Sequence, residues 1–416
     1  MSTVAYIANQ FPSPVEPYIV DEIKQLRKRG LEVVACSAQR AETAGLTPDQ
    51  LTLARETVFL QPLRPWLLIR AALLCALRFG LLADFFERIL LHGNELPGRR
   101  MRALLHTWLG AYYAVLLQSR GVEHIHVHHG YFASWVAMVA ARLMGIGFSM
   151  TLHGSDLLIH RAYLDTKLAN CCFCFTVSEY NRRYILDRYS DADPRKVILQ
   201  RMGVDPCREG VPVFRAGIRP YAVLLAVGRL HPVKDHAFLL RACALLKQAG
   251  VTFVCLIAGE GPERKSLEQL IFQSRLQDEV KLLGHVSREQ LDSYYAIADL
   301  VVLSSRSEGI PLVLMEAMIR GKTVLAPAIT GIPELVIHEQ TGFLYRPGSL
   351  EDFVAQVESV VKSDSRLASL QRAAREHVLS QFNRNTNLEH FCNLFIEHII
   401  APTESACHEN PLLQQI

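Results

Sequence analysis

The sequence lacks the patterns that mark several common protein classes. Its ten cysteines are scattered, and no two cysteine pairs have the spacing of a zinc site, so we expect reduced thiols that fill a core. No G-x-G-x-x-G follows the first apolar run, where Ala8-Asn9-Gln10 stands instead. That absence argues against a nicotinamide-dependent oxidoreductase or epimerase, as does the absence of a suitably placed Tyr-x-x-x-Lys pair.

An excess of charge of one sign is also lacking. The formal net charge is +3 and charged residues make up 20% of the chain, so nothing points to nucleic acid as a partner. The first residues, Met1-Ser-Thr-Val-Ala-Tyr-Ile, have no basic region before an apolar run. We therefore expect no signal peptide and a cytoplasmic protein.

The most apolar segment, Trp66–Leu82, is interrupted by Arg70 and Arg78 and falls short of a membrane-spanning helix. A basic run at 99–102 and an amphipathic stretch at 103–117 follow it. One interpretation is a pair of helices packed on the N-terminal domain. The other is a basic, apolar surface in weak contact with an anionic membrane, peripheral on the inner face of the plasma membrane. The two interpretations are compatible.

Length and hydrophobic content suggest about two domains in these 416 residues. Short apolar runs alternate with longer helical patterns along the whole chain, which predicts an α/β protein with parallel sheets covered on both faces. The expected strands are 4–8, 32–36, 58–60, 125–128, 148–152, 172–177, 197–199, 223–227, 253–258, 280–283, 300–303, 323–326 and 342–345.

Domain boundaries follow from composition. Residues 204–220 are rich in Pro, Gly and Arg and have no hydrophobic period, which predicts a linker. We expect an N-terminal domain at 1–203, with a helical segment at 62–119, and a C-terminal domain at 221–378. A last helix at 379–400 and a disordered tail at 401–416 complete the chain.

Two glutamates, Glu308 and Glu316, bracket the segment Gly309-Ile310-Pro311-Leu312 after an apolar run. Pro311 suits the first turn of a helix, and Gly321 suits its end. The segment therefore predicts strand, loop and helix N-terminus, where backbone N–H groups and the helix dipole favour a phosphate. Both glutamates could accept hydrogen bonds from hydroxyl groups beside that phosphate.

A second strand end, Val227-Gly228-Arg229, is followed by Lys234 and Asp235. Glycine permits close backbone approach, and the two cations offer hydrogen-bond donors to phosphate oxygens. The alternative is that both are ordinary surface bases.

Histidines cluster at two further strand ends. His124, His126 and His128 alternate along one strand face, but no carboxylate or cysteine pair accompanies them with ligand spacing, so we expect no metal. The second element is His153-Gly-Ser-Asp156, where His153 could contact a reacting hydroxyl and Asp156 could orient the loop.

These segments resemble retaining glycosyltransferases of family 4, the group 1 glycosyl transferases. Glu308 and Glu316 match the E-x7-E signature, Arg229 and Lys234 the G-R-x-x-x-x-K element, and His153 to Asp156 the H-G-x-D segment. Asp235 departs from the glycine common after the lysine, and we expect it to be tolerated at a helix N-terminus. The F-P-x-x-x-E-x-Y run that ends in Glu16 and Tyr18 resembles the colanic-acid and exopolysaccharide subgroup.

The resemblance implies a GT-B fold, with two facing Rossmann-like domains and a cleft between them. It also implies that the last helix, at 379–400, crosses back to the N-terminal domain. It implies that His153 and Glu308 are catalytic and that Glu16 and Asp156 shape the acceptor side. The implied donor-binding residues are Arg229, Lys234, Val286, Gly309, Ile310, Pro311, Leu312 and Glu316.

The implied reaction is metal-independent transfer of a sugar from a UDP- or GDP-linked donor, with no cofactor. The acceptor would be a saccharide, such as a lipid-linked surface polysaccharide precursor. The alternative is an inactive partner that binds sugar nucleotides in a polysaccharide assembly complex.

Overall fold

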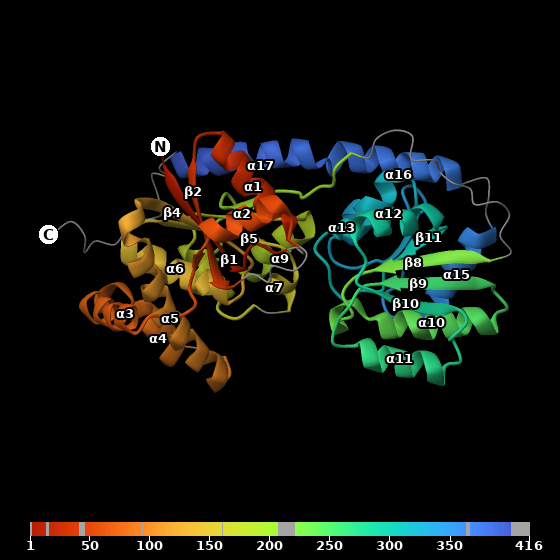
Figure 1. Cartoon of the computed structure of the whole chain (residues 1–416), viewed down its shortest axis with the longest axis horizontal. Coiled ribbons are helices and arrows are strands. Elements are labelled where there is room, and N and C mark those ends of the chain that lie inside the picture. Colours follow the sequence, from red (N-terminus) through yellow and green to blue (C-terminus); the bar gives the residue numbers. More distant parts are fainter. Residues whose placement is uncertain are drawn as a thin grey trace. The chain divides into compact units, whose positions relative to one another are not determined.

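The computed structural model describes residues 2–13, 16–40, 46–92, 95–159, 161–206, 221–362 and 367–400. The chain divides into two compact units (Figure 1). The first consists of Met1–Val177, Asn181–Gln200 and the segment that begins at Leu388, and the second of Ser178–Tyr180 and Arg201–Asn387. The expected tail at 401–416 and most of the expected linker lie outside the described residues.

The first unit is built on a seven-stranded sheet in the order β3-β2-β1-β4-β5-β6-β7, and its neighbouring strands pair in parallel. Its strands are β1 (Thr3–Gln10), β2 (Glu32–Gln39), β3 (Val58–Phe59), β4 (Val122–His128), β5 (Gly147–Leu152), β6 (Phe173–Thr176) and β7 (Val197–Leu199). Side chains alternate across β1: Ala5 and Ile7 join one core, and Val4 and Tyr6 join the other. Both faces are therefore covered, which is why the strands are continuous apolar runs.

Ten helices with described residues are associated with this sheet. They are α1 (Pro17–Lys28), α2 (Pro48–Glu56), α3 (Pro65–Leu77), α4 (Ala83–Leu90), α5 (Pro97–Leu117), α6 (Phe132–Met144), α7 (Ser155–Leu158), α8 (Leu164–Asn170), α9 (Glu179–Arg188) and α17 (Arg384–Ile400). Pro17, Pro65 and Pro97 stand at helix N-termini, where the missing N–H group is harmless. Phe391 and Phe395 of α17 are buried against the core that contains Val4 and Tyr6.

The second unit is built on a six-stranded parallel sheet in the order β10-β9-β8-β11-β12-β13. Its strands are β8 (Ala222–Val227), β9 (Phe253–Ala258), β10 (Val280–Gly284), β11 (Leu300–Val302), β12 (Thr323–Pro327) and β13 (Phe343–Tyr345). Its helices are α10 (His236–Gln248), α11 (Arg264–Gln273), α12 (Arg288–Ile297), α13 (Leu312–Ile319), α14 (Ile332–Leu335), α15 (Leu350–Lys362) and α16 (Leu367–Gln381).

Helices cover both faces of the second sheet as well. In Figure 1, α10 and α11 lie on one side of β8, β9 and β10, and α12, α13 and α16 lie on the other. Leu224 of β8 packs into the hydrophobic core on one face of this sheet, and Leu225 packs into the core on the other face. The predicted α/β class with parallel sheets is confirmed, and each expected strand has a counterpart in the structure.

Candidate active site

The strand order locates the candidate site in each unit. In chain order the first sheet runs 3-2-1-4-5-6-7 and the second runs 3-2-1-4-5-6, so the order reverses between β1 and β4 and between β8 and β11. In doubly wound sheets, ligands bind outside the carboxyl ends of the strands at such a reversal. Arg229 and Lys234 follow β8 and Glu308 follows β11, whereas His128 is the last residue of β4 and His129 follows it.

Lys234 and Glu308 meet directly at the reversal in the second unit. The Lys234 Nζ lies 2.5 Å from Oε1 of Glu308, and the Ser305 hydroxyl donates to the same oxygen at 2.6 Å. The Thr330 hydroxyl donates to the backbone carbonyl of Glu308 at 2.6 Å. Both the side chain and the backbone carbonyl of Glu308 are therefore held, and its carboxylate is paired with an ammonium group where sequence spacing alone predicted two separate groups.

Asp235, which follows the lysine, has a left-handed backbone conformation. Its φ of 48° is left-handed, a conformation that favours glycine but that Asp also adopts. The carboxylate accepts a hydrogen bond from Phe238 N at 3.2 Å and from Arg306 Nε at 2.7 Å. Asp235 is therefore the N-cap residue of α10, at the helix N-terminus where it was expected.

The loop that follows β11 enters α13 at Leu312, and Pro311 is the N-cap residue, one position earlier than expected. The chain approaches closely here, because a Cβ on Gly331 would lie 2.3 Å from the Gly309 carbonyl. Ile310 and Pro311 are buried, which fixes the direction of the helix N-terminus. Its first amides have no partner within the helix and can face an anion.

Glu316 lies inside α13 rather than on its loop. Its Oε2 accepts a hydrogen bond from the Tyr295 hydroxyl at 3.2 Å. Burial raises the pKa of this carboxyl, although Arg320 opposes the shift. Arg229 is exposed directly after β8, and Val286 is half-buried after β10.

In the first unit, His153 belongs to a chain of three hydrogen-bonded side chains. Its Nε2 lies 3.1 Å from Nδ1 of His128, and Nε2 of His128 lies 2.9 Å from Oε2 of Glu22. Tyr6 donates to the same Glu22 oxygen at 2.8 Å. Sequence reasoning missed Glu22, because nothing in its spacing on α1 distinguishes it from a solvated helix residue.

This chain has a direction. An ionised carboxylate only accepts, so the neutral form of His128 donates from Nε2 to Glu22 and accepts at Nδ1 from His153. His153 then carries its proton on Nε2 and offers Nδ1 as an acceptor. Burial, followed by the charge of His129, lowers the pKa of His153 well below its usual range, so its neutral form prevails.

Asp156 holds the His153 loop from within. It is fully buried, and its carboxylate accepts from the backbone N–H groups of Gly130, His153 and Gly154 at 2.7–3.2 Å. It also lies 3.6 Å from Nδ1 of His129, whose Nε2 contacts Oε1 of Glu16 at 2.8 Å. The structure therefore joins Glu16 and Asp156 through one histidine.

The two carboxylates beside His129 shift its pKa. Burial by itself lowers the pKa of His129, but the carboxylates of Asp156 and Glu16 outweigh it and raise the pKa from its usual value to about 10. Tyr18, from the same F-P-x-x-x-E-x-Y run as Glu16, packs on His153 with ring centroids 5.0 Å apart. That run thus reaches the histidine cluster.

The other histidines of β4 are structural in their contacts. His124 and His126 bond the Ser149 hydroxyl at 2.7 and 2.8 Å, and burial lowers the pKa of His124 to about 3. Among the described residues, no group of three His, Cys, Asp or Glu side chains has an arrangement that could hold a metal ion.

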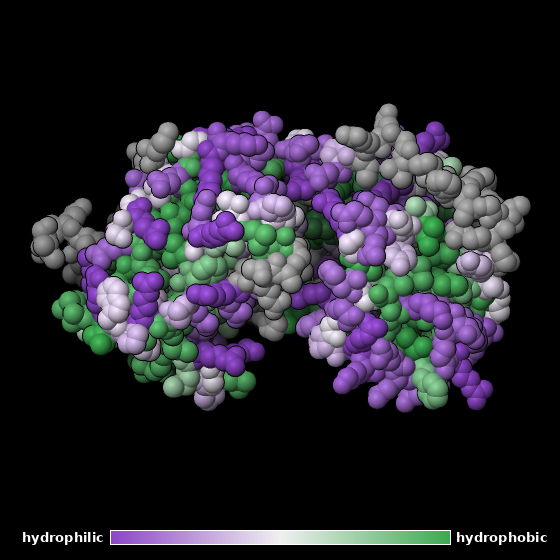
Figure 2. All heavy atoms as spheres, viewed as in Figure 1, coloured by the Kyte–Doolittle hydropathy of each residue, from purple (hydrophilic) through white to green (hydrophobic). Residues whose placement is uncertain are grey.

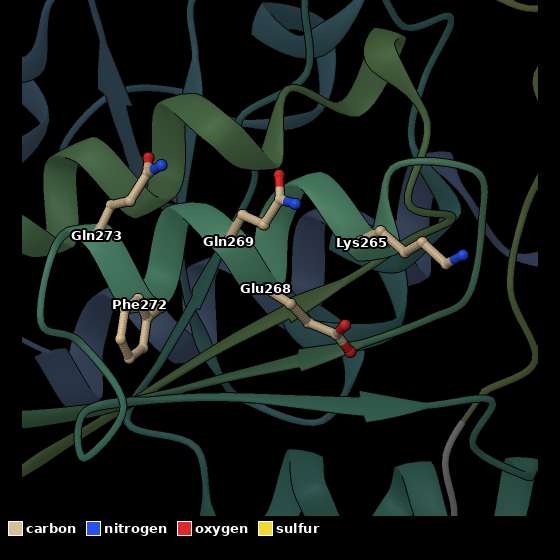
Figure 3. A pocket seen from close by; sticks show the side chains of 5 residues that line it. All are labelled: Lys265, Glu268, Gln269, Phe272 and Gln273. Atoms are coloured by element: carbon tan, nitrogen blue, oxygen red, sulfur yellow. The ribbon is translucent and has the colours of Figure 1, made fainter.

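A separate hollow lies along α11, where Lys265, Glu268, Gln269, Phe272 and Gln273 point outward from one helix (Figure 3). None of the predicted site residues lines it.

Comparison with known proteins agrees with these features. Residues 15–208 match the family model described as Glycosyltransferase Family 4, and residues 216–377 match the model for Glycosyl transferases group 1. The chain belongs to this glycosyltransferase family, and its fold is GT-B.

Among curated relatives, the amylovoran biosynthesis glycosyltransferase AmsK of Erwinia amylovora is 32% identical over 46% of this chain and 48% of its own. The match to such relatives spans about half of their length. The D-inositol 3-phosphate glycosyltransferase of Mycolicibacterium smegmatis is 28% identical over 88% of this chain and 82% of its own. A crystal structure of HepE from Anabaena in complex with UDP and glucose is similar in fold, with a TM-score of 0.70 and 19% identity over 95% of this chain and 99% of that one.

Proposed function

We propose that this protein is a retaining glycosyltransferase that moves a sugar from a UDP- or GDP-linked donor to a saccharide hydroxyl. The observation that carries the proposal is the Lys234–Glu308 pair at the strand-order reversal of the second unit, beside the N-terminus of α13. The family supports the activity, and the UDP-bound neighbour supports a nucleotide donor.

In this proposal the leaving group is a nucleoside diphosphate. Arg229, Lys234 and the first amides of α13 stabilise the negative charge that develops on it, without a metal ion or another cofactor. Gly309 to Leu312 line the phosphates, Val286 lies against the base, and Glu316 accepts hydrogen bonds from the ribose.

Glu308 acts as a partner for sugar hydroxyls and for positive charge rather than as a covalent nucleophile. Its carboxylate is already engaged by Lys234 and Ser305, which lowers its nucleophilicity. The acceptor attacks the face that the diphosphate leaves, and the departing phosphate takes the acceptor's proton. His153 contributes the acceptor atom Nδ1 to a donor-sugar or substrate hydroxyl, with Glu16 and Asp156 holding its surroundings.

We place the acceptor among lipid-linked precursors of a surface polysaccharide, at the cytoplasmic face of the membrane. The names of relatives such as the amylovoran enzyme support this class. The second candidate function, an inactive partner that binds sugar nucleotides, shares the donor site and differs only in turnover.

A thermal-shift screen with UDP, GDP and their sugars tests the donor class. A ligand that binds only the folded state raises the melting temperature, and we expect one of the two nucleotides to do so. A protein that neither nucleotide stabilises at millimolar concentration would contradict the proposal. Release of nucleoside diphosphate from the selected sugar nucleotide then separates an enzyme from an inactive binding protein.

A further inference from the structure

The outer face of α3 is apolar and exposed. Trp66, Ile69, Leu73 and Leu77 recur at helical spacing with exposed fractions of 53, 70, 56 and 75%. The opposite face of the helix buries Leu67 and Ala71 in the core of the first unit. The helix is therefore apolar on both sides, and packing within its own unit accounts for only one of them.

The exposed apolar surface continues beyond this helix. Phe79, Leu90, Leu91, Leu96, Met101 and Leu105, all between α3 and the first half of α5, are 48–74% exposed. In Figure 2, hydrophobic residues gather over the region that Figure 1 labels α3, α4 and α5. Such a concentration of exposed large side chains marks an interaction surface.

The sequence of α3 and its immediate flanks carries charge of one sign. Between Val58 and Ala83 the sequence contains no Asp or Glu, whereas Arg64, Arg70 and Arg78 are all exposed. The Arg70 guanidinium lies over the Trp66 ring, 5.7 Å from its centroid. Arginines that border an apolar face with an exposed tryptophan fit a surface of anionic headgroups over hydrocarbon.

The length of α3 determines whether this helix could span a bilayer or only lie on it. At about 1.5 Å per residue, a helix such as α3 is shorter than the roughly 30 Å hydrocarbon core. Within the described part of the chain, no helix is long and apolar enough to cross a membrane. The geometry therefore suits a helix that lies in the plane of the interface, with the protein on one side and lipid on the other.

We infer that the outer face of α3, defined by Trp66, Ile69, Leu73 and Leu77, docks this protein onto an anionic lipid bilayer. The inference goes beyond the proposed function, since docking requires neither sugar nucleotide nor acceptor. It is also more specific than the membrane contact expected from the sequence, because only one face of α3 inserts into the bilayer. The basic residues at 99–102 have at most a supporting role.

Co-sedimentation with vesicles tests the inference. The full chain is mixed with vesicles of phosphatidylcholine alone or with phosphatidylglycerol added, at low and high salt. We expect binding to the anionic vesicles that weakens as salt rises. The double variant Ile69→Glu, Leu73→Glu should lose about tenfold or more in partitioning, because it places charge in the apolar interface.

A matched control comes from the second unit. Phe272 is 71% exposed on α11, so Phe272→Glu removes an equally exposed apolar side chain, and we expect it to leave vesicle binding unchanged. Arg64→Gln with Arg70→Gln should weaken binding to anionic vesicles and remove most of its salt dependence.

Several results would overturn the inference. The wild-type chain could stay in solution when anionic vesicles sediment. The Phe272→Glu control could lose as much vesicle binding as the double Glu variant, or the double Glu variant could bind vesicles as well as the wild type. Sedimentation velocity without lipid completes the test: a wild-type dimer that the α3 variant abolishes, with no vesicle binding, would assign the face to a second copy of the chain. UDP- or GDP-induced thermal shifts, which the α3 variants should retain, verify their folding and separate this test from that of the donor site.

Discussion

The Nζ atom of Lys234 lies 2.5 Å from Oε1 of Glu308, although 74 positions separate the two residues in the chain. The pair joins the segment that follows β8 to the loop that follows β11. Because the Lys234 ammonium group is already paired with the Glu308 carboxylate, a diphosphate has to compete with that carboxylate for it. The two residues are therefore expected to act as one unit, with opposite effects on nucleotide affinity.

Replacing Glu308 by Gln should leave nucleoside diphosphate affinity equal or tighter, since Lys234 loses its competing anion. Turnover should fall by roughly 10²-fold, because the proposed charge partner of the reacting sugar is lost. Calorimetry and initial rates measure the two effects. Lys234→Met should instead weaken nucleotide binding by about 1.5–3 kcal/mol, with the exposed Lys265→Met on α11 as the control. Weakened nucleotide binding in Glu308→Gln would contradict this account of the pair.

Glu316→Ala should weaken nucleotide binding through loss of an acceptor for the ribose hydroxyls. A charge-assisted hydrogen bond of this kind contributes on the order of 1.5–3 kcal/mol. Tyr295→Phe is the matched control, because it keeps the Glu316 carboxylate and removes only the Tyr295 hydroxyl, which contacts Glu316 and the Val313 carbonyl, and its effect should be smaller. Unchanged calorimetric affinity in Glu316→Ala would rule out the ribose role.

His153→Ala should reduce turnover heavily while nucleotide affinity stays nearly intact, since its interaction is realised mainly in the transition state. Glu22→Gln tests the hydrogen-bond chain behind it. A Gln amide can donate to His128 and so reverse the chain, which should move the His153 proton from Nε2 to Nδ1 and lower turnover. Nitrogen-15 NMR of the histidines reports the tautomer, and Glu56→Gln, at an exposed position, serves as the control. A His153 tautomer unchanged in Glu22→Gln would contradict the positioning role.

The ion pair of His129 should make stability depend on pH. Its folded-state pKa of about 10 lies above the ordinary value of 6.5, so its contribution is complete below about pH 6.5 and is lost as pH rises through about 10. His129→Asn removes the titrating ring and keeps a residue that accepts the positive φ of 69°. Urea unfolding should show wild type more stable than the variant at pH 6, by on the order of a few kcal/mol, with a difference that shrinks toward pH 10. A pH-independent difference would contradict the ion pair.

Local patterns in the sequence were sufficient for the strands and for most of the loops at their ends. Continuous Val, Leu and Ile runs such as 223–227 and 300–303 predicted β8 and β11, because strands buried on both faces leave that record. The direct contact of Lys234 with Glu308 was not predicted, since it depends on which strands become neighbours. Glu22 was missed for the same reason: its partner His128 is 106 positions away.

For the helical segment at 62–119, the sequence could not show which helix face is buried. Its apolar and basic character was evident from Trp66 to Leu82, but α3 is apolar on two sides, so periodicity could not show which face the core would bury. The structure assigns Leu67 and Ala71 to the core and Ile69 and Leu73 to the surface. Burial of one face follows from tertiary packing, which a single sequence does not encode locally.

The stereochemistry of donor cleavage in the presence of EDTA tests the central claim most directly. The donor is the α-linked UDP- or GDP-sugar that binds, and the acceptor is water or a saccharide. Proton NMR identifies the anomer that forms first. Retaining, metal-independent transfer predicts an α-configured product at a rate that EDTA leaves unchanged. A β-configured product, or activity that EDTA abolishes and Mg²⁺ or Mn²⁺ restores, would contradict it.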